Sequence, residues 1–271
     1  MPHILILGLG YTTSRLAARL QAAGWQVTAT RRLAGDGVLQ FDDPAVAAAV
    51  AAASHIVSSV PPDADGDPVL RQYGEALAAA PAVWLGYLSS TGVYGDTKGA
   101  WVDESADVGN GRRGARVAAD LAWQGLRDDV RVFRLPGIYG PGRSAIDRVR
   151  SGTASRIDAP GHRFSRIHVD DIVGAVIASF DRGAPGIYNL ADDAPASGAA
   201  VIEYACDLLG IRYPPLEALA DARLSPMARG FYLESRQVAA GKMVRELGVR
   251  LRYPDFRAGL RACLSPGYAA R

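Results

Sequence analysis

The stretch that decides the fold is His3-Ile-Leu-Ile-Leu-Gly-Leu-Gly-Tyr-Thr-Thr13. The apolar run Ile4–Leu7 is followed at once by Gly8 and Gly10, and Ser14–Ala23 then has apolar residues at helical spacing. A buried strand, a glycine turn and a helix in this order predict the first unit of a parallel sheet. The glycines leave room for a dinucleotide pyrophosphate to rest on the helix N-terminus. The alternative is a tight strand–helix turn that binds no ligand.

The same alternation continues through the first half of the chain. Further strands are expected at Gln26–Thr30, Val38–Phe41, His55–Ser59, Val83–Leu88 and Val130–Leu135, with helical stretches between them at 44–53, 69–80 and 112–127. Continuous apolar strands separated by helices predict a doubly wound α/β fold, in which helices cover both faces of a parallel sheet.

The second half is less regular. Asp170 is a good N-cap for a helix to about Phe180, and the later expected elements are a strand at 186–190 and helices at 197–209, at 242–247 and after Pro254. We therefore expect a dinucleotide-binding Rossmann domain of residues 1–142 and 165–192. A small C-terminal substrate lobe then consists of residues 143–164 and 193–271.

Composition excludes several classes of function. A formal charge of +2 on 271 residues, without blocks of like charge, argues against a nucleic-acid partner. Cys206 and Cys263 have no nearby His or Cys in the sequence, which supports neither a metal site nor a disulfide framework. No apolar run reaches the ~18 residues of a membrane helix, and the chain starts directly with a strand. A cytoplasmic protein without a membrane partner is expected.

The end of the second strand decides the nucleotide. NAD-selective enzymes place an acidic residue there, but this chain has Thr30-Arg31-Arg32. A guanidinium can bind a 2′-phosphate through two hydrogen bonds, so NADP is preferred over NAD. The alternative is a pair of solvated arginines. Thr13 replaces the third glycine of the fingerprint, and its branched side chain should push the helix outward or shift it slightly.

The run Leu88-Ser-Ser-Thr-Gly-Val-Tyr-Gly-Asp-Thr-Lys98 strongly resembles the serine-bearing segment of the extended short-chain dehydrogenase/reductases, the NAD-dependent epimerase/dehydratase family. The family's later landmarks are matched, in order, by Arg134-Leu-Pro-Gly-Ile-Tyr-Gly-Pro-Gly142, Arg166-Ile-His-Val-Asp-Asp171, Tyr188-Asn189 and Arg245-Glu-Leu-Gly248. The resemblance thus covers essentially the whole chain.

The resemblance implies roles for individual residues. Ser90 matches the family residue that hydrogen-bonds the substrate carbonyl or hydroxyl, with Thr91 beside it. Asp42 resembles the aspartate that contacts adenine, and its alternative role is to cap the helix near Pro44. The other expected cofactor contacts are at the start of the first helix and at two strand ends: Tyr11, Thr12, Thr13, Ser59 and Pro136.

The family's catalytic helix reads Tyr-x-x-x-Lys-x-x-x-Glu, and this chain departs from it. If Asp120 matches the acidic end, Arg116 stands at the lysine position and Arg112 at the tyrosine position. Arginine stays protonated, so Arg112 cannot pass a proton as a phenol does. Arg116 could hold a nicotinamide ribose, and Arg112, Arg113 or Arg116 could bind an anionic substrate. The alternative is that all three are solvated at the start of the helix.

The chain's one Tyr-x-x-x-Lys is Tyr94 to Lys98, in a glycine-containing loop where this spacing does not stack the side chains. Tyr94 could still act as an acid with Ser90, and a packing tyrosine is the alternative. The expected substrate contacts, besides Thr91 and Arg112, are Tyr139, His162, Arg229 and Phe231. His168 is interpreted as a core or hydrogen-bonded histidine.

Two functions remain open from the sequence. The first is an NADP-dependent oxidoreductase or epimerase-like enzyme for a small hydroxyl or carbonyl substrate, in which Ser90 polarises the substrate oxygen and Tyr94 or a bound water supplies the proton. The second is a catalytically silent NADP-binding sensor or partner-binding protein. A homodimer through the helices near 70–80 and 112–127 is a further hypothesis, because the second helix has small residues for close packing.

Overall fold

The computed structural model of the protein describes residues 1–35, 37–109 and 111–265. Its centre is a seven-stranded sheet in which each neighbouring pair of strands is parallel. From edge to edge the order is β3 (Leu39–Gln40), β2 (Gln26–Arg31), β1 (His3–Leu7), β4 (His55–Ser58), β5 (Trp84–Ser90), β7 (Val130–Leu135) and β11 (Gly186–Asn189). The order reverses direction at β1, as in a doubly wound fold, so the predicted fold class is confirmed.

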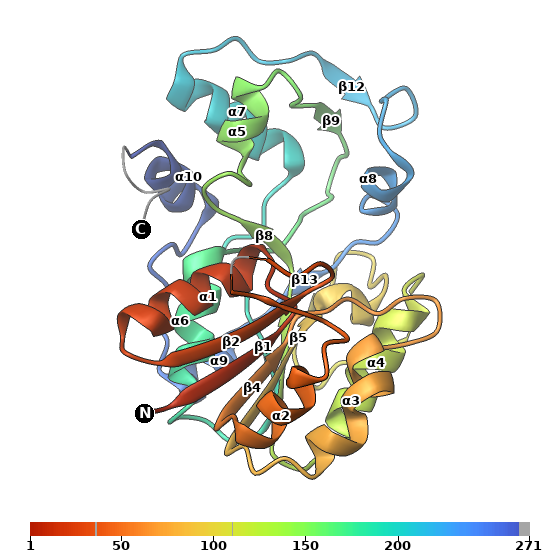
Figure 1. The fold of residues 1–271 in the computed structure, drawn as a ribbon. Helices are drawn as coiled ribbons and strands as arrows, with labels where there is room; N and C mark the ends of the chain where they lie inside the picture. The colour runs from red at the N-terminus through yellow and green to blue at the C-terminus, as the bar shows by residue number, and fades with distance from the viewer. Residues whose placement is uncertain (36, 110, 266–271) are drawn as a thin grey trace.

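Helices cover both faces of this sheet (Figure 1). One face carries α1 (Tyr11–Ala22), α6 (Val169–Ala178) and α9 (Gly241–Leu247), and the other carries α2 (Ala45–Ala52), α3 (Pro68–Ala78) and α4 (Gly114–Gln124). Strand side chains alternate between the two cores: Ile4 and Ile6 pack toward α1, whereas Leu5 and Leu7 pack toward α2. None of the described helices has both the length and the apolarity to cross a bilayer.

A smaller layer lies above the carboxyl ends of the strands (Figure 1). It contains α5 (Ala145–Arg150), β9 (Arg156–Asp158), α7 (Gly198–Leu209), β12 (Leu216–Ala218), α8 (Pro226–Gly230) and α10 (Phe256–Leu264). Its own core includes Ile146, Ile202 and Phe256. The last residues of the predicted lobe, 266–271, lie outside the described residues.

Part of the predicted lobe belongs physically to the sheet domain. Met243 and Leu247 of α9 are fully buried in the same core as α1 and α6. Just before them, β13 (Gln237–Val238) pairs with β6 (Trp101–Val102). The chain therefore returns to the sheet after α8, and the apolar face of the short helix α9 is buried there. The chain then re-enters the lobe with α10.

Two helix starts differ from the expected ones. His168 rather than Asp170 caps α6, and its Nδ1 accepts the Asp170 N–H at 3.1 Å. The strand β10 (Arg166–His168), paired with β8 (Gly137–Tyr139), brings this fully buried histidine to the end of the helix. At α2, the carboxylate that accepts the Ala45 N–H is Asp43. Asp42 is exposed and does not have the alternative role of capping.

A buried ion pair joins α4 to the middle of the sheet. Arg134 of β7 donates to both carboxylate oxygens of Asp120, from Nη2 at 2.7 Å and from Nε at 3.2 Å. The Ser89 hydroxyl of β5 donates to the same carboxylate at 2.5 Å. Both charged side chains are at most 2% exposed. Because a buried charge is stable only with hydrogen-bonding partners, this pair sets how α4 lies against β5 and β7.

We expect Asp120→Ala to lower the free energy of unfolding by about 3–5 kcal/mol, because it leaves the Arg134 charge buried without a partner. Ser89→Ala removes one hydrogen bond from a pair that stays intact, and should cost about 1 kcal/mol. Urea unfolding followed by far-UV circular dichroism measures both. Equal losses for the two variants would contradict this account of the pair.

Candidate functional site

The glycine turn after β1 has the geometry of a phosphate cradle. Gly8 has a φ of +92°, and a Cβ there would lie 2.9 Å from Val60 Cγ2, so only glycine fits. A Cβ at Gly10 would meet nothing within 4 Å, which leaves the N-terminus of α1 open. The N–H groups of the first turn of a helix have no partner inside the helix, so those of Tyr11 and Thr12 are available to an anion here.

Thr13 stabilises this turn from within. Its hydroxyl donates to the Gly8 carbonyl and accepts the Gly10 N–H, both at 2.8 Å, and the residue is fully buried. The Thr13 hydroxyl thus makes hydrogen bonds that a glycine could not, and an outward push or slight shift of the helix stays a prediction. Ser59, just after β4, donates to the Gly8 carbonyl from the other side at 2.7 Å.

Tyr11 reaches across to the lobe side of the site. Its hydroxyl donates to the Pro141 carbonyl at 3.1 Å, and Arg15 and Arg143 lie against its ring, with Cζ to centroid distances of 5.7 and 5.5 Å. Burial raises the pKa of the Tyr11 phenol to about 12, and the nearby Arg15 opposes the shift. The side chain of Tyr11 is thus a structural bridge, and its backbone N–H is the group that faces the cradle.

Arg31, the last residue of β2, lies over the glycine turn. Its Nε donates to the Leu9 carbonyl at 3.1 Å, and the side chain is otherwise exposed. Arg32 is exposed as well, without a hydrogen bond to any described residue. The guanidinium of Arg31 is thus held beside the glycine turn, and its contact to a ribose 2′-phosphate stays a prediction. Asp42 is exposed just after β3, two strands from β1 at the same sheet edge.

Ser90 ends β5 on this same edge of the sheet. Its Oγ accepts the Gly92 N–H at 3.1 Å and caps the short 3-10 helix η1 (Thr91–Tyr94). The Ser90 hydroxyl hydrogen has no acceptor among the described residues and can donate to a substrate oxygen. Thr91 is buried and donates to the Leu135 carbonyl at 3.5 Å, so its hydroxyl is directed into the protein. Pro136 follows β7 on the same edge.

Tyr94 does not take part in this site. It is 1% exposed, its hydroxyl donates to Asn189 Oδ1 at 2.7 Å, and Arg134 lies against its ring. The expectation that Tyr94 supplies the proton is corrected, because its phenol is enclosed and bonded in the core; it is a packing tyrosine. Lys98 has a φ of +54° in a loop, so Tyr94 and Lys98 do not form a helical pair.

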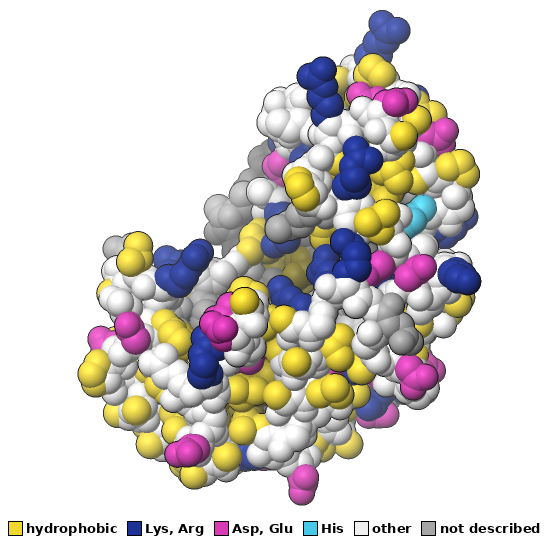
Figure 2. All heavy atoms as spheres, turned by 90° about the vertical axis from the view of Figure 1, so that its right-hand side faces the viewer, with side chains coloured by type: hydrophobic (Ala, Val, Ile, Leu, Met, Phe, Trp, Pro, Cys, Tyr) yellow, Lys and Arg dark blue, Asp and Glu magenta, His cyan; other side chains and the backbone are white. Residues whose placement is uncertain are grey.

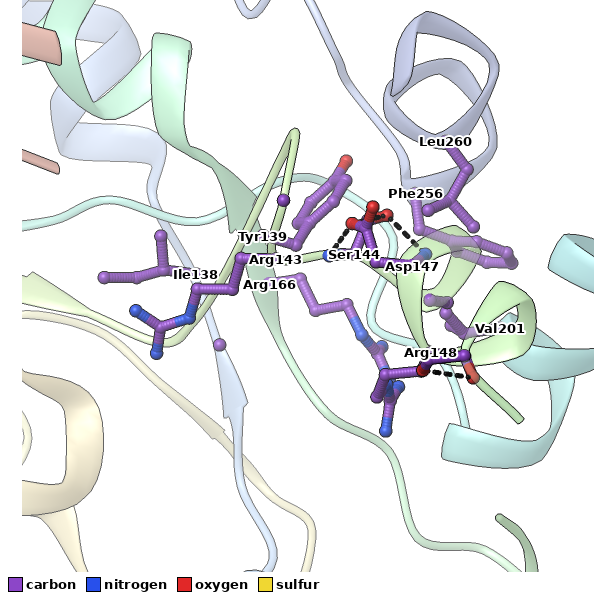
Figure 3. Close-up of a pocket in the computed structure, with 14 residues that line it drawn as sticks. Ile138, Tyr139, Arg143, Ser144, Asp147, Arg148, Arg166, Val201, Phe256 and Leu260 are labelled. Carbon is purple, nitrogen blue, oxygen red and sulfur yellow. Dashed lines mark hydrogen bonds between the residues drawn. The ribbon is translucent and has the colours of Figure 1, made fainter. Parts of the chain in front are cut away.

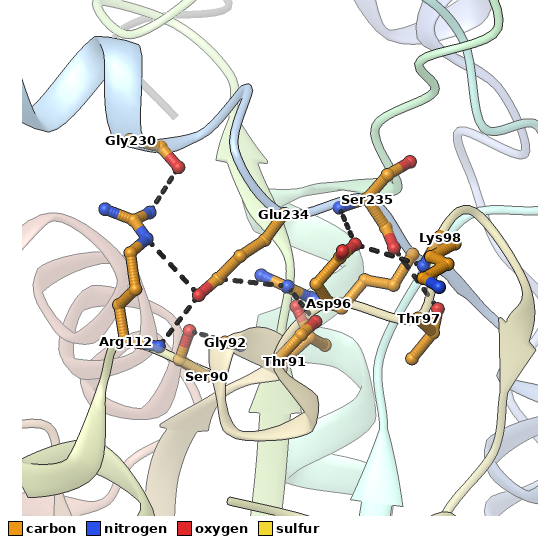
Figure 4. A network of polar contacts seen from close by, with 12 residues as sticks. Ser90, Thr91, Gly92, Asp96, Thr97, Lys98, Arg112, Gly230, Glu234 and Ser235 are labelled. Carbon is orange, nitrogen blue, oxygen red and sulfur yellow. Dashed lines mark hydrogen bonds and ion pairs between the residues drawn. The ribbon is translucent and has the colours of Figure 1, made fainter. Parts of the chain in front are cut away.

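Arg112 ties the sheet domain to the lobe (Figure 4). It lies two residues before α4, where its backbone N–H donates to Glu234 Oε1 at 2.9 Å and its Nε lies 3.4 Å from the same oxygen. Its Nη2 also donates to the Gly230 carbonyl. Arg112 is thus committed to a structural contact. It does not take the helical position that the family's tyrosine occupies.

Arg116, in the first turn of α4, remains at the lysine position. It is partly buried and near Tyr87: burial raises the pKa of the Tyr87 phenol, and the Arg116 charge is among the groups that lower it. Since Tyr87 is in β5, three residues before Ser90, Arg116 lies over the strand that carries the serine. The contact to a nicotinamide ribose stays a prediction.

Four residues were expected to contact the substrate from the lobe side, and the structure places them in different surroundings. Tyr139 is buried and its hydroxyl donates to the Asp255 carbonyl at 3.2 Å, which makes it part of the lobe core. Arg229 donates to the carbonyls of Leu219 and Ala222, both at 2.8 Å, so its guanidinium holds a loop and does not line the cleft. Phe231 is 45% exposed.

His162 belongs to an aromatic cluster. Its ring lies 4.5 Å from Phe164 and 5.5 Å from Tyr232, and burial lowers its pKa. The Nε2 atom of His162 is buried without a hydrogen-bond partner in the described part of the chain. A neutral imidazole in this setting packs against aromatic rings, and its free nitrogen can still accept a hydrogen bond.

A cavity of about 600 Å³ lies between β8 and the lobe helices (Figure 3). Its lining combines apolar residues with three arginines and consists of Gly137, Ile138, Tyr139, Gly142, Arg143, Ser144, Ala145, Asp147, Arg148, Ser151, Arg166, Val201, Phe256 and Leu260. Burial lowers the pKa of Arg166 to about 10, although the charge of Asp192 acts in the opposite direction. Figure 2 shows the molecule hollowed between its two parts, with Lys and Arg side chains around the hollow.

The structure adds Arg148, Arg166 and Asp192 to the residues at this cleft or beside its lining. The sequence did not single them out as site residues. Arg148 and Arg166 line the cavity. Asp192, which influences Arg166, is 2% exposed, and burial raises its carboxyl pKa to about 7. No motif marks these positions, and only the folded chain brings them together. Within the described residues, no three His, Cys, Asp or Glu side chains form a group that could hold a metal ion.

No protein-family model matches the chain. The curated protein YeeZ of Escherichia coli K12 is 27% identical over an alignment of 285 positions, which covers 94% of this chain and 97% of YeeZ. The 3-diazoavenalumate denitrifying reductase of a Streptomyces species is 31% identical over 140 positions, 48% of this chain and 45% of the reductase.

Solved structures are similar over nearly the whole chain. A conserved protein of unknown function from Silicibacter pomeroyi DSS is 41% identical with a TM-score of 0.90, covering 97% of this chain and 98% of that one. A putative NAD-dependent epimerase/dehydratase from Methylobacillus flagellatus is 26% identical with a TM-score of 0.71, covering 97% of each chain.

Two more distant structures share the fold alone. They are human SDR39U1 with NADPH, at 19% identity and a TM-score of 0.77, and MoeE5 with UDP-glucuronic acid and NAD, at 20% and 0.76. SDR39U1 is matched over 96% of this chain and 98% of its own, and MoeE5 over 96% of each. The sheet order, the landmarks quoted from the sequence and these likenesses agree, and the chain belongs to the NAD-dependent epimerase/dehydratase family of extended short-chain dehydrogenase/reductases.

Proposed function

We propose that this protein is an NADP-dependent oxidoreductase that acts on a small hydroxyl or carbonyl compound. The observation that carries the proposal is the meeting of two sites at one edge of the sheet. The open glycine turn of β1 and the free hydroxyl of Ser90 at the end of β5 both lie at the carboxyl ends of parallel strands, where open α/β sheets bind ligands.

The preference for NADP over NAD rests on Arg31. Its Nε is anchored to the Leu9 carbonyl, which holds the rest of the guanidinium over the glycine turn. A pre-positioned guanidinium binds a phosphate through charge-assisted hydrogen bonds and lacks the acceptor that a free ribose hydroxyl needs. Proteins that share the fold were solved with NADPH and with NAD, so the choice depends on this chain's own residues.

Ser90 and Arg116 have separate roles in the proposed hydride transfer. The nicotinamide, when bound, supplies or accepts the hydride. Ser90 donates its hydroxyl hydrogen to the reacting substrate oxygen, while the Gly92 N–H keeps the serine oriented. Arg116 holds the nicotinamide ribose from the start of α4. Because Tyr94 is enclosed in the core, water in the open cleft supplies the proton to the substrate oxygen.

A second candidate is a catalytically silent NADP-binding sensor or partner-binding protein. The observation in its favour is that the described structure offers no phenol beside Ser90 in place of the family's tyrosine: Tyr94 bonds Asn189, and arginines precede α4. In that case the cofactor binds without turnover. In both candidates the cofactor binds at the glycine turn. Only in the enzyme does Ser90 donate a hydrogen bond to a reacting substrate.

The protein is further proposed to act in the cytoplasm as a homodimer. Both cysteines are free thiols, as in a reducing compartment. The outward face of α4 exposes Ala118, Leu121 and Ala122, with Leu121 50% exposed, and α3 lies beside α4 (Figure 1). Small side chains around one exposed leucine allow the helices of two copies to approach closely.

For the cofactor, Arg31→Ala should weaken NADPH binding about tenfold or more and leave NADH binding unchanged, because only the 2′-phosphate uses this guanidinium. Fluorescence titration of both nucleotides measures the change. Arg32→Ala is the matched control, and its effect should be smaller because Arg32 is not anchored to the turn. Equal affinity of the wild type for NADPH and NADH would refute NADP selectivity.

For catalysis, Ser90→Ala should lower turnover about 100-fold without changing the Kd for NADPH, because one hydrogen bond to the reacting oxygen is lost. A panel of small aldehydes and ketones is tested with NADPH, and small alcohols with NADP, by following NADPH fluorescence. Ser105→Ala, an exposed serine away from the cleft, is the control. If no compound is turned over although NADPH binds, the silent candidate replaces the enzyme.

For assembly, the wild type should have the mass of a dimer in light scattering after size exclusion, and Leu121→Glu should shift it to a monomer, since a buried carboxylate without a partner is costly. Leu216→Glu is the matched control, because Leu216 is also 50% exposed but lies in the lobe. A monomeric wild type would rule out the dimer.

A further inference from the structure

We propose that Arg113 binds an anionic group of the substrate, a carboxylate or a phosphate, directly beside Ser90. The inference rests on the proposed function and deepens it by naming the chemical class of the substrate. It concerns one arginine at the start of α4 and the narrow space between η1 and the segment after α8.

The position of Arg113 follows from the glycine at 92. A Cβ at Gly92 would lie 2.8 Å from Arg113 Cδ, and both Arg113 Nη1 and Ser90 Oγ would be 3.3 Å from the same point. Any side chain at this position would force Arg113 to shift. The guanidinium and the catalytic hydroxyl thus flank one small volume, so that a single small molecule can contact both.

The other side of Arg113 is covered by the lobe. The Phe231 ring centroid lies 5.0 Å from Arg113 Cζ, so the guanidinium lies between the backbone of η1 and an aromatic ring. Phe231 is 45% exposed and follows α8, which Arg112 holds through the Gly230 carbonyl. The Phe231 ring thus limits how far the guanidinium can move away from η1.

Arg113 has no hydrogen-bond acceptor or ion-pair partner anywhere in residues 1–35, 37–109 and 111–265. Its neighbours in the same cluster do: Arg112 contacts Glu234 and the Gly230 carbonyl, and Arg236 contacts Glu234 and the Gly95 carbonyl. No nitrogen of Arg113 is among the buried side-chain atoms that lack a partner, so its donors are accessible from solvent and available to a bound anion.

The surrounding charge also favours an anion. Burial lowers the pKa of Arg113 most, and the charges of Arg116, Arg236 and Arg112 lower it further, while Glu234 alone raises it. The side chain nevertheless remains protonated at any ordinary pH. Three further guanidinium groups and one carboxylate thus act on Arg113, and the positive potential that results concentrates anions there.

The substrate class follows from these two donors. A planar guanidinium binds a carboxylate or a phosphate through two parallel hydrogen bonds, and Ser90 binds the reacting oxygen. Since both donors border the same small volume, the anionic group must be close to the reacting carbon, as in a 2-oxo or 2-hydroxy acid or a small phosphorylated carbonyl compound. Arg113 cannot release a proton, so its role is to position the substrate and select for charge.

The test uses two nearly isosteric probes on the full-length protein, with and without saturating NADPH: oxamate, an anion, and oxamide, its neutral counterpart. Inorganic phosphate is the third probe, and separates a phosphate from a carboxylate as the preferred group. Isothermal titration calorimetry gives the Kd values. The wild type should bind oxamate or phosphate at least tenfold more tightly than oxamide.

Substitutions of Arg113 test whether this residue binds the anion. Arg113→Gln should weaken binding of the preferred anion at least tenfold, and Arg113→Lys should restore part of it, because an ammonium keeps the charge but not the planar pair of donors. Arg150→Gln, an exposed arginine at the end of α5, removes the same charge outside the cleft and should change nothing. Near-UV circular dichroism and the Arg113→Lys variant distinguish loss of binding from loss of folding.

Three results would overturn the inference: wild-type protein that prefers oxamide, an Arg113→Gln variant that keeps full anion affinity, or an NADPH affinity that falls in Arg113→Gln, since the cofactor's phosphates would then be the anion that Arg113 serves. Failure of the wild type to bind NADPH would instead contradict the proposed function. Titration of NADPH alone therefore tells the two failures apart.

Discussion

The ion pair of Asp120 with Arg134 is the interaction on which the candidate site depends. It connects α4 to β7, and through the Ser89 hydroxyl it also connects α4 to β5. Ser90 follows Ser89, and Arg113 and Arg116 begin α4, so the pair sets the distance between the serine and the arginines. A buried charge needs its partner close by, so the pair holds α4 against β5 and β7.

A second set of contacts holds the segment after α8 over the cleft. The chain from Gly230 to Val238 runs back along residues 95–102, where Asp96 Oδ1 accepts the Ser235 N–H at 2.8 Å and β13 pairs with β6. The ion pair of Arg112 with Glu234 ties the first of these segments to the start of α4. These contacts place Phe231 over Arg113. Tyr94 is enclosed in the core, and Arg112, Arg113 and Arg116 lie at the start of α4, beneath this segment.

The outline of the fold was predictable because it depends on local patterns. The strand Val130–Leu135 was predicted to the residue, and the helices that end at Gly210 and Gly248 end where glycine adopts the left-handed conformation. The predicted cap of α6 was wrong for a local reason, because His168 rather than Asp170 accepts the N–H at the helix start. The role proposed for Tyr94 was wrong because its hydroxyl bonds Asn189, a partner distant in the sequence.

For the candidate site, the sequence by itself predicted that the glycine turn, Arg31 and Ser90 lie at strand ends, because each lies at a fixed offset from a strand. The tertiary structure alone decided the roles of Tyr94, Arg112 and Arg113. All three lie within twenty residues of each other, yet one phenol is enclosed, one guanidinium is paired with the lobe and one is left without an acceptor. Spacing along the chain does not reveal this, because the partners Asn189, Glu234 and Phe231 come from segments about a hundred residues away.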